Sequence, residues 1–262
     1  MSKYTHDSIV PFKDSVLGKK EQVADMFNQI AFRYDFLNRF LSGGIDQSWR
    51  KKAIRELDKN ANFANAKNAN DTNDANPLKI LDVATGTADM AILMTRMLPQ
   101  AKITGIDISS GMLEIGKQKI ARLQLANRVE LLAGDCEALR FPDNSFDAIT
   151  VAFGIRNFEN LEEGLREMLR VLKPGGHLVV LEFSQPKNPI FIQLCNIYMR
   201  VFTPVVGKMI SKNREAYAYL NKSVEAFPEG AALLAILNAT GYTHTRLKTL
   251  SLGICTIYCG TK

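Results

Sequence analysis

The sequence has few cysteines and histidines, and they are scattered. Its three histidines lie far apart, at positions 6, 177 and 244, and no CxxC pair occurs among its four cysteines, Cys136, Cys195, Cys255 and Cys259. Zinc sites need thiolates and imidazoles at short, regular spacings, so we predict no metal site. Thiols with this distribution are typical of buried residues in a reducing compartment.

Long apolar runs are also missing. No uncharged apolar stretch reaches the roughly 18 residues that a membrane-spanning helix needs. The N-terminal sequence MSKYTHDSIVPFKD lacks the apolar centre of a signal peptide. We therefore expect a cytoplasmic protein, with any membrane contact being peripheral and at the inner face of the membrane.

What the chain does have is the composition of an ordinary globular protein, with 46% hydrophobic and 23% charged residues. Its 33 Lys and Arg exceed its 27 Asp and Glu, giving a net charge of +6. This excess suits nucleic acid or an anionic membrane surface, but it is also common in proteins that bind neither. A length of 262 residues allows one large domain, or one domain and an arm, and we favour the second.

Residues 59–77, KNANFANAKNANDTNDANP, are dominated by Asn and Ala and have no amphipathic period. We interpret them as a surface loop between an N-terminal helical arm, residues 1–58, and a larger Rossmann-like domain, residues 78–262. Within that domain, apolar runs alternate with helical patterns, which is typical of a doubly wound parallel sheet with crossover helices. A mostly helical segment at about 189–241 is expected to form a lid.

The expected strands are short apolar runs bounded by turn residues. They are LKILDVA (78–84), AKITGIDI (101–108), RVELLAGD (128–135), FDAITVAFGI (146–155) and HLVVLEFS (177–184). The chain closes with two further strand-like segments, HTRLKTLSL and GICTIYCGTK, joined at Gly253 without a helix between them. Such neighbours must pair antiparallel, so the α/β sheet should be mostly parallel with an antiparallel last strand.

Carboxylates stand at the ends of three successive strands, where ligands bind in such sheets. Asp82 precedes the turn TGTAD, and Asp107 and Asp135 end the next two strands. Each alone is explained by helix capping or by a turn. Together, at one edge of a sheet, they favour a binding site.

The turn itself has a single glycine, Gly86, where a dinucleotide site needs GxGxxG, and acidic neighbours would repel a pyrophosphate. The same surroundings suit S-adenosylmethionine (SAM), which carries an ammonium and a sulfonium. In this hypothesis Asp107 accepts from both ribose hydroxyls, and Asp135 accepts from the adenine amino group beside the backbone of Cys136. The candidate cofactor-binding residues are Asp82, Gly86, Thr87, Asp107, Asp135 and Cys136.

Several longer motifs carry a resemblance to a family. They are YDFLNRFLSGGIDQSW (34–49), LDVATGTADMA, CEALRFPDNSFD, FGIRNF, RVLKPGGHLVVLEFS (170–184) and YAYLNKSVEAFP (217–228). Over nearly its whole length the chain resembles the SAM-dependent C-methyltransferases of menaquinone and ubiquinone biosynthesis. It departs from that family at Asp46, where His is usual, at Ala152, where Ser is frequent, and in the loss of two glycines from the cofactor loop.

The resemblance implies a class I SAM-dependent methyltransferase fold and a reaction: transfer of a methyl group to a ring carbon of a reduced, prenylated quinone, demethylmenaquinol to menaquinol. Arg156 and Asn157, which follow the fourth strand, are then expected to stabilise the ring oxygen as it gains charge. Asp35, with Tyr34 beside it, is the candidate proton acceptor. Asp46 is left out of the catalytic set.

Alternatives stay open at this point. Arg156 can instead form a surface ion pair with Glu159 or Glu162, and Tyr34 and Trp49 can simply be buried aromatics. The acceptor can be a polyprenyl benzoquinol of ubiquinone biosynthesis. An RNA methyltransferase is a less favoured function, because no base-stacking motif is visible and no nucleic-acid partner is expected. The sequence leaves homo-oligomerisation open.

Overall fold

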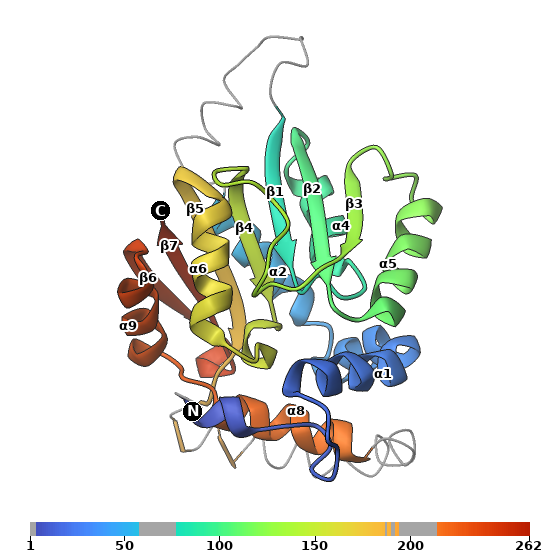
Figure 1. Cartoon of the computed structure of the whole chain (residues 1–262), viewed down its shortest axis with the longest axis vertical. Helices are drawn as coiled ribbons and strands as arrows, with labels where there is room; N and C mark the ends of the chain where they lie inside the picture. Colours follow the sequence, from blue (N-terminus) through green and yellow to red (C-terminus); the bar gives the residue numbers. More distant parts are fainter. Residues whose placement is uncertain (1–3, 58–76, 187, 190–191, 194–213) are drawn as a thin grey trace.

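The computed structural model describes residues 4–57, 77–186, 188–189, 192–193 and 214–262 (Figure 1). Its centre is one seven-stranded sheet in the order β3-β2-β1-β4-β5-β7-β6, in which β7 runs antiparallel to both β5 and β6. This confirms the predicted mostly parallel sheet with an antiparallel last strand. The strands are β1 (Leu78–Val83), β2 (Ala101–Asp107), β3 (Val129–Ala133), β4 (Phe146–Ala152), β5 (Leu172–Phe183), β6 (Thr243–Leu250) and β7 (Cys255–Thr261).

Helices cover both faces of the sheet. They are α1 (Lys19–Leu41), α2 (Asp46–Leu57), α4 (Asp89–Met97), α5 (Ser110–Arg122), α6 (Leu161–Val171), α8 (Arg214–Ala226) and α9 (Ala231–Thr240), with 3-10 turns η1 (Thr5–Ser8), η2 (Ile155–Asn157) and η3 (Ser251–Gly253). Neighbouring residues of β1 point to opposite faces: Ile80 packs with α2 and α4, and Leu81 packs with α6 and α9. Continuous apolar strands follow from this two-sided burial.

The segment expected to form an arm is divided between two layers. Helix α2 buries Trp49, Ala53, Ile54 and Leu57 in the same core as β1 and α4, so it is part of the domain that follows it in the sequence. Helix α1 instead lies across the carboxyl ends of the strands, between α5 and α8 in the view of Figure 1. Because α2 has no core of its own, the expected boundary at residue 58 does not separate two hydrophobic cores.

The junction between α6 and β5 also differs from the expectation. The helix ends at Val171 and the strand starts at once with Leu172, which pairs with Phe146 of β4. Lys173–Gly176 therefore belong to an irregular first part of β5, held by a bond from the Gly175 amide to the Lys262 carbonyl.

Some expectations fall outside the described residues. These are nearly all of the Asn/Ala-rich loop at 59–77 and most of residues 189–213, the first part of the segment expected to form a lid. The second part of that segment contains α8 and α9. Among the residues that are described, none of the helices is both long and apolar enough to span a bilayer.

Candidate active site

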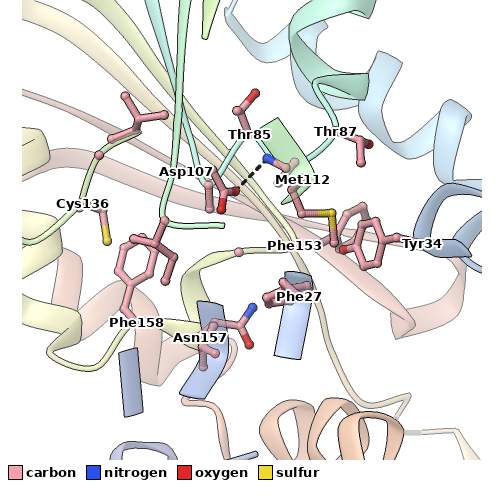
Figure 2. A pocket seen from close by; sticks show the side chains of 18 of the residues that line it. Phe27, Tyr34, Thr85, Thr87, Asp107, Met112, Cys136, Phe153, Asn157 and Phe158 are labelled. Atoms are coloured by element: carbon pink, nitrogen blue, oxygen red, sulfur yellow. Dashed lines mark hydrogen bonds between the residues drawn. The ribbon is translucent and has the colours of Figure 1, made fainter. Parts of the chain in front are cut away.

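A cavity of about 880 Å³, including the space at its mouth, opens at the carboxyl ends of β1, β2, β3 and β4, under α1 (Figure 2). This is the edge at which a doubly wound sheet binds its ligand. Helix α1 forms one wall with Lys20, Val23, Phe27, Tyr34, Asp35 and Asn38. The loops after the strands form the other walls.

The loop after β1 has a constrained backbone. Ala84, Gly86 and Ala88 all have positive φ, between 52° and 65°, a conformation that only glycine adopts without strain. Asp82 holds this loop from below: it is buried, and its two carboxylate oxygens accept hydrogen bonds of 2.6 Å from the hydroxyls of Thr85 and Thr150. Burial raises the pKa of Asp82, and the two hydroxyl donors oppose that shift. Asp82 therefore shapes the loop from beneath and is not among the described residues that line the cavity.

Asp107 reaches the cavity itself. Its two carboxylate oxygens accept from the backbone amides of Gly86 and Ser109, each at 2.8 Å, and the first of these bonds is drawn in Figure 2. A carboxylate has about four lone-pair directions, so Asp107 keeps acceptor capacity for the hydroxyls of a diol. Burial raises the pKa of Asp107 to about 6. Gly105 lets Thr85 pack against β2, because a Cβ at position 105 would lie 2.8 Å from the Thr85 hydroxyl.

At the end of β3, Asp135 and Glu137 are joined to α1 by a lysine. The Lys20 ammonium lies 2.6 Å from Asp135 and 3.1 Å from Glu137. The adjacent Cys136 thiol lines the cavity, and burial raises its pKa well above the usual range, so it is a neutral apolar wall and not a nucleophile. Lys20 offsets the negative charge at this end of the cavity.

Asp35 is engaged in contacts between α1 and the cofactor loop. One of its oxygens accepts from the Thr87 hydroxyl and the other pairs with the Lys119 ammonium of α5, both at 2.5 Å. Lys119 also pairs with Asp89 at 2.7 Å. Both carboxylate oxygens of Asp35 are engaged within the protein, so its contacts favour a role in holding α1 over the loop.

The remaining walls are aromatic. Phe27 and Tyr34 meet edge to face, with centroids 5.7 Å apart. Figure 2 shows Phe153 next to these two rings and Phe158 on the other side of the cavity, beside Cys136. Asn157 supplies a polar group between Phe27 and Phe158, and it is only 8% exposed. The cavity thus combines acidic residues with aromatic walls.

Arg156, expected at the cavity mouth, is turned into the protein. It is 3% exposed, and its guanidinium pairs with the fully buried Glu182 at 2.6 Å and donates to the Phe153 carbonyl at 2.8 Å. It is not among the described residues of the cavity wall. Its partner is neither of the two surface glutamates considered above, because η2 rotates the side chain toward β5.

Two other residues of the motif YDFLNRFLSGGIDQSW (34–49) have structural roles. Trp49 is buried against Phe153 and Phe183 and donates to the Ser251 hydroxyl at 2.8 Å. Asp46 accepts from Ser42 at 3.0 Å at the start of α2, away from the described cavity wall.

Sequence reasoning did not assign many of the wall residues, among them Lys20, Phe27, Met112, Phe153 and Phe158. A signal for two of them was present. Lys20, Phe27 and Tyr34 are spaced by seven residues, which places them on one face of a helix. The aromatics after β4 carry no comparable periodic signal.

Comparison with known proteins identifies the family. The sequence profile of the ubiE/COQ5 methyltransferase family matches residues 15–262. The chain belongs to this family. It is a SAM-dependent methyltransferase.

Among its relatives, this methyltransferase is 44% identical to the demethylmenaquinone methyltransferase of Bacteroides fragilis, over 99% of both chains. It is also 44% identical to the ubiquinone/menaquinone biosynthesis C-methyltransferase UbiE of Geotalea daltonii, over 93% of this chain and 97% of that one.

A solved structure with a similar fold is a putative SAM-dependent methyltransferase from Methanococcus maripaludis. Its TM-score is 0.61 at 18% identity, covering 90% of this chain and 94% of that one. At that identity the likeness shows the class I methyltransferase fold alone.

The cavity fits SAM on two observations. Asp107 retains acceptor capacity for the ribose hydroxyls, and a Cβ at Gly86 would meet no atom within 4 Å, so the loop leaves room beside that carboxylate. Asp107, Gly86 and Thr87 would hold the nucleoside and its neighbouring chain, and Asp135 and Cys136 would border the adenine. When bound there, SAM supplies an electrophilic methyl group.

Proposed function

We propose that this methyltransferase methylates a ring carbon of demethylmenaquinol, giving menaquinol. The observation that carries the proposal is the aromatic compartment beside the cofactor residues, with Asn157 as its buried polar group. The relatives' printed names support it, because they include demethylmenaquinone methyltransferases that match nearly the full chain. Phe27, Tyr34, Phe153 and Phe158 would hold a flat ring by stacking and edge contacts.

The acceptor must be the quinol. Loss of a hydroxyl proton raises electron density on the ring carbon that attacks, and the ring later loses its own proton to restore aromaticity. An Asn157 N–H directed at the ring oxygen stabilises the negative charge as it develops. Tyr34 borders the same ring, and water is the simplest proton acceptor, because both oxygens of Asp35 already have partners in the protein. Arg156 does not line the cavity; it bonds the carbonyl of Phe153, which does.

A second acceptor is the polyprenyl benzoquinol of ubiquinone biosynthesis. The observation that favours it is the match to relatives named for both ubiquinone and menaquinone biosynthesis. The choice depends on whether the second ring of a naphthoquinol fits between Phe27 and Phe153.

One experiment tests both. The purified protein is incubated with methyl-labelled SAM and either reduced demethylmenaquinone or the reduced benzoquinone, and the product is identified by mass spectrometry. We expect one labelled methyl group on a ring carbon of the naphthoquinol. Exclusive labelling of the benzoquinol would transfer the proposal to the alternative, and no labelling of either quinol would refute it.

We further propose that the protein works at the inner face of the membrane as a peripheral protein, where prenylated substrates reside. The support is on α1, where Phe32 and Phe36 are 92% and 55% exposed and share one helix face. Sedimentation with vesicles of anionic lipid at low salt is expected to carry the protein down, and Phe32→Ser with Phe36→Ser is expected to reduce that binding. Equal sedimentation of the double variant would remove this face from the proposal.

A further inference from the structure

Asn157 is connected to α8 by a buried hydrogen bond. The hydroxyl of Tyr219 donates to Oδ1 of Asn157 at 3.1 Å, and Tyr219 is only 2% exposed. A side-chain amide has one acceptor end and one donor end, so a partner at the oxygen fixes where the nitrogen points. Figure 2 shows the nitrogen of Asn157 turned toward Phe27 and the other cavity residues, with the oxygen turned away.

The direction of that hydrogen bond follows from the chemistry of its two partners. Burial raises the pKa of the Tyr219 hydroxyl well above its usual range, so the hydroxyl keeps its proton. The Asn157 oxygen can only accept. The proton is left to point at Asn157.

Arg156 is itself fixed on several sides. Glu182 accepts from it at 2.6 Å, the Phe153 carbonyl accepts at 2.8 Å, and the Ser223 hydroxyl of α8 lies 3.3 Å from its Nε. Its guanidinium also lies over the Phe183 ring, 5.5 Å from the centroid. Arg156 is therefore fixed between β5 and α8.

We propose that Tyr219 is a positioning residue for methyl transfer: it orients the Asn157 amide so that an N–H faces the ring oxygen of the acceptor. The inference rests on the proposed function, since it needs an acceptor whose oxygen gains negative charge. Arg156 supports this arrangement by its bond to Ser223, which lies one helical turn from Tyr219 on α8. A wrongly oriented amide would present its oxygen and repel the same charge.

The test is Tyr219→Phe, which removes one hydroxyl and keeps the ring. Loss of an oriented donor that strengthens as charge develops is expected to lower kcat about five- to tenfold. KM for the quinol and Kd for SAM should change less than about twofold, because neither depends on that charge. In an Asn157→Ala background, Tyr219→Phe should have no further effect on kcat.

Tyr242→Phe is the matched control. Tyr242 is also 2% exposed, and its hydroxyl donates at 3.1 Å to the Leu165 carbonyl, outside the described cavity wall. It loses an equivalent buried bond, so it should lower the thermal unfolding midpoint while leaving kcat unchanged. Asn157→Asp keeps Tyr219 intact and replaces the donor by a carboxylate oxygen, so its kcat should fall further than that of Tyr219→Phe.

The outcomes separate the two proposals. If the wild-type protein turns over the quinol and Tyr219→Phe keeps full kcat, the positioning role is wrong. It is equally wrong if Tyr219→Phe lowers kcat as much in the Asn157→Ala background, or if Asn157→Asp is fully active. A wild-type protein that methylates neither quinol overturns the proposed function and this inference together.

Discussion

The carboxylate of Asp107 is expected to make SAM affinity depend on pH near pH 6, where most carboxylates are already fully ionised. Burial raises the pKa of Asp107 to about 6, and it accepts hydrogen bonds from the Gly86 and Ser109 amides. Ribose hydroxyls would donate to the ionised form and stabilise it. Lowering the pH through 6 protonates the carboxyl, so binding should weaken on the acid side.

The size of the effect follows from the fraction ionised. At pH 7.5 nearly all molecules carry the carboxylate, whereas at pH 5 only about one in eleven does, given a pKa of about 6. If the ionised form alone binds well, Kd at pH 5 is about tenfold higher than at pH 7.5, which is a loss of about 1.4 kcal/mol of binding free energy. Isothermal titration of SAM into the protein at pH 5.0, 6.0 and 7.5 measures it.

Asp107→Asn is the matched variant. It keeps the shape but has one acceptor oxygen for two backbone amides, so one amide loses its partner at a cost of about 1–3 kcal/mol, and Kd should rise at pH 7.5. Its residual pH dependence measures other groups, such as the buried Asp82, whose pKa is also raised. A wild-type Kd that is equal at pH 5.0 and 7.5 would refute this reasoning, as would an Asp107→Asn variant with the full wild-type pH dependence.

Three further variants test the surroundings of the cavity. Arg156→Ala leaves Glu182 buried and unpaired, so urea unfolding should show a loss of about 3–5 kcal/mol; unchanged stability would contradict the buried pair. Gly154→Ala brings a Cβ within 2.5 Å of the Ala84 Cβ, so it should destabilise the fold by about 1–3 kcal/mol, with rescue by Ala84→Gly in a thermal unfolding series. Asp35→Asn removes the charge that pairs with Lys119, and SAM affinity measured by calorimetry should fall about five- to tenfold. If kcat at saturating SAM stays at the wild-type value, Asp35 only holds α1 in place. If kcat is lost, Asp35 is the proton acceptor.

The strands and most helices were predictable because their signals are local. Strands buried on both faces appear as continuous apolar runs. Serine is a frequent N-cap, and the hydroxyl of Ser109 accepts from the Met112 amide at the start of α5. The antiparallel pairing of the last two strands followed from the short link between them. Asp107 was found by the same logic, since it ends a strand at the ligand-binding edge.

The depth of each carboxylate was set by strand register, which the sequence does not display. Asp82 pairs with Gly105, two residues before Asp107, so it lies inside the edge where Asp107 emerges. Both residues look like strand ends in the sequence. Only the pairing of β1 with β2 places one beneath the loop and the other in the cavity.

The orientation of the Arg156 side chain likewise depends on the tertiary structure. The sequence by itself determined the sheet, its family and the row of residues that reaches the cleft edge, because apolar periodicity and turn residues act over a few positions. Whether Arg156 faces solvent, substrate or core depended on Glu182, 26 positions away, and on Ser223 of α8. A buried guanidinium is stable only beside a partner charge, and which charge that is becomes defined when distant elements pack together.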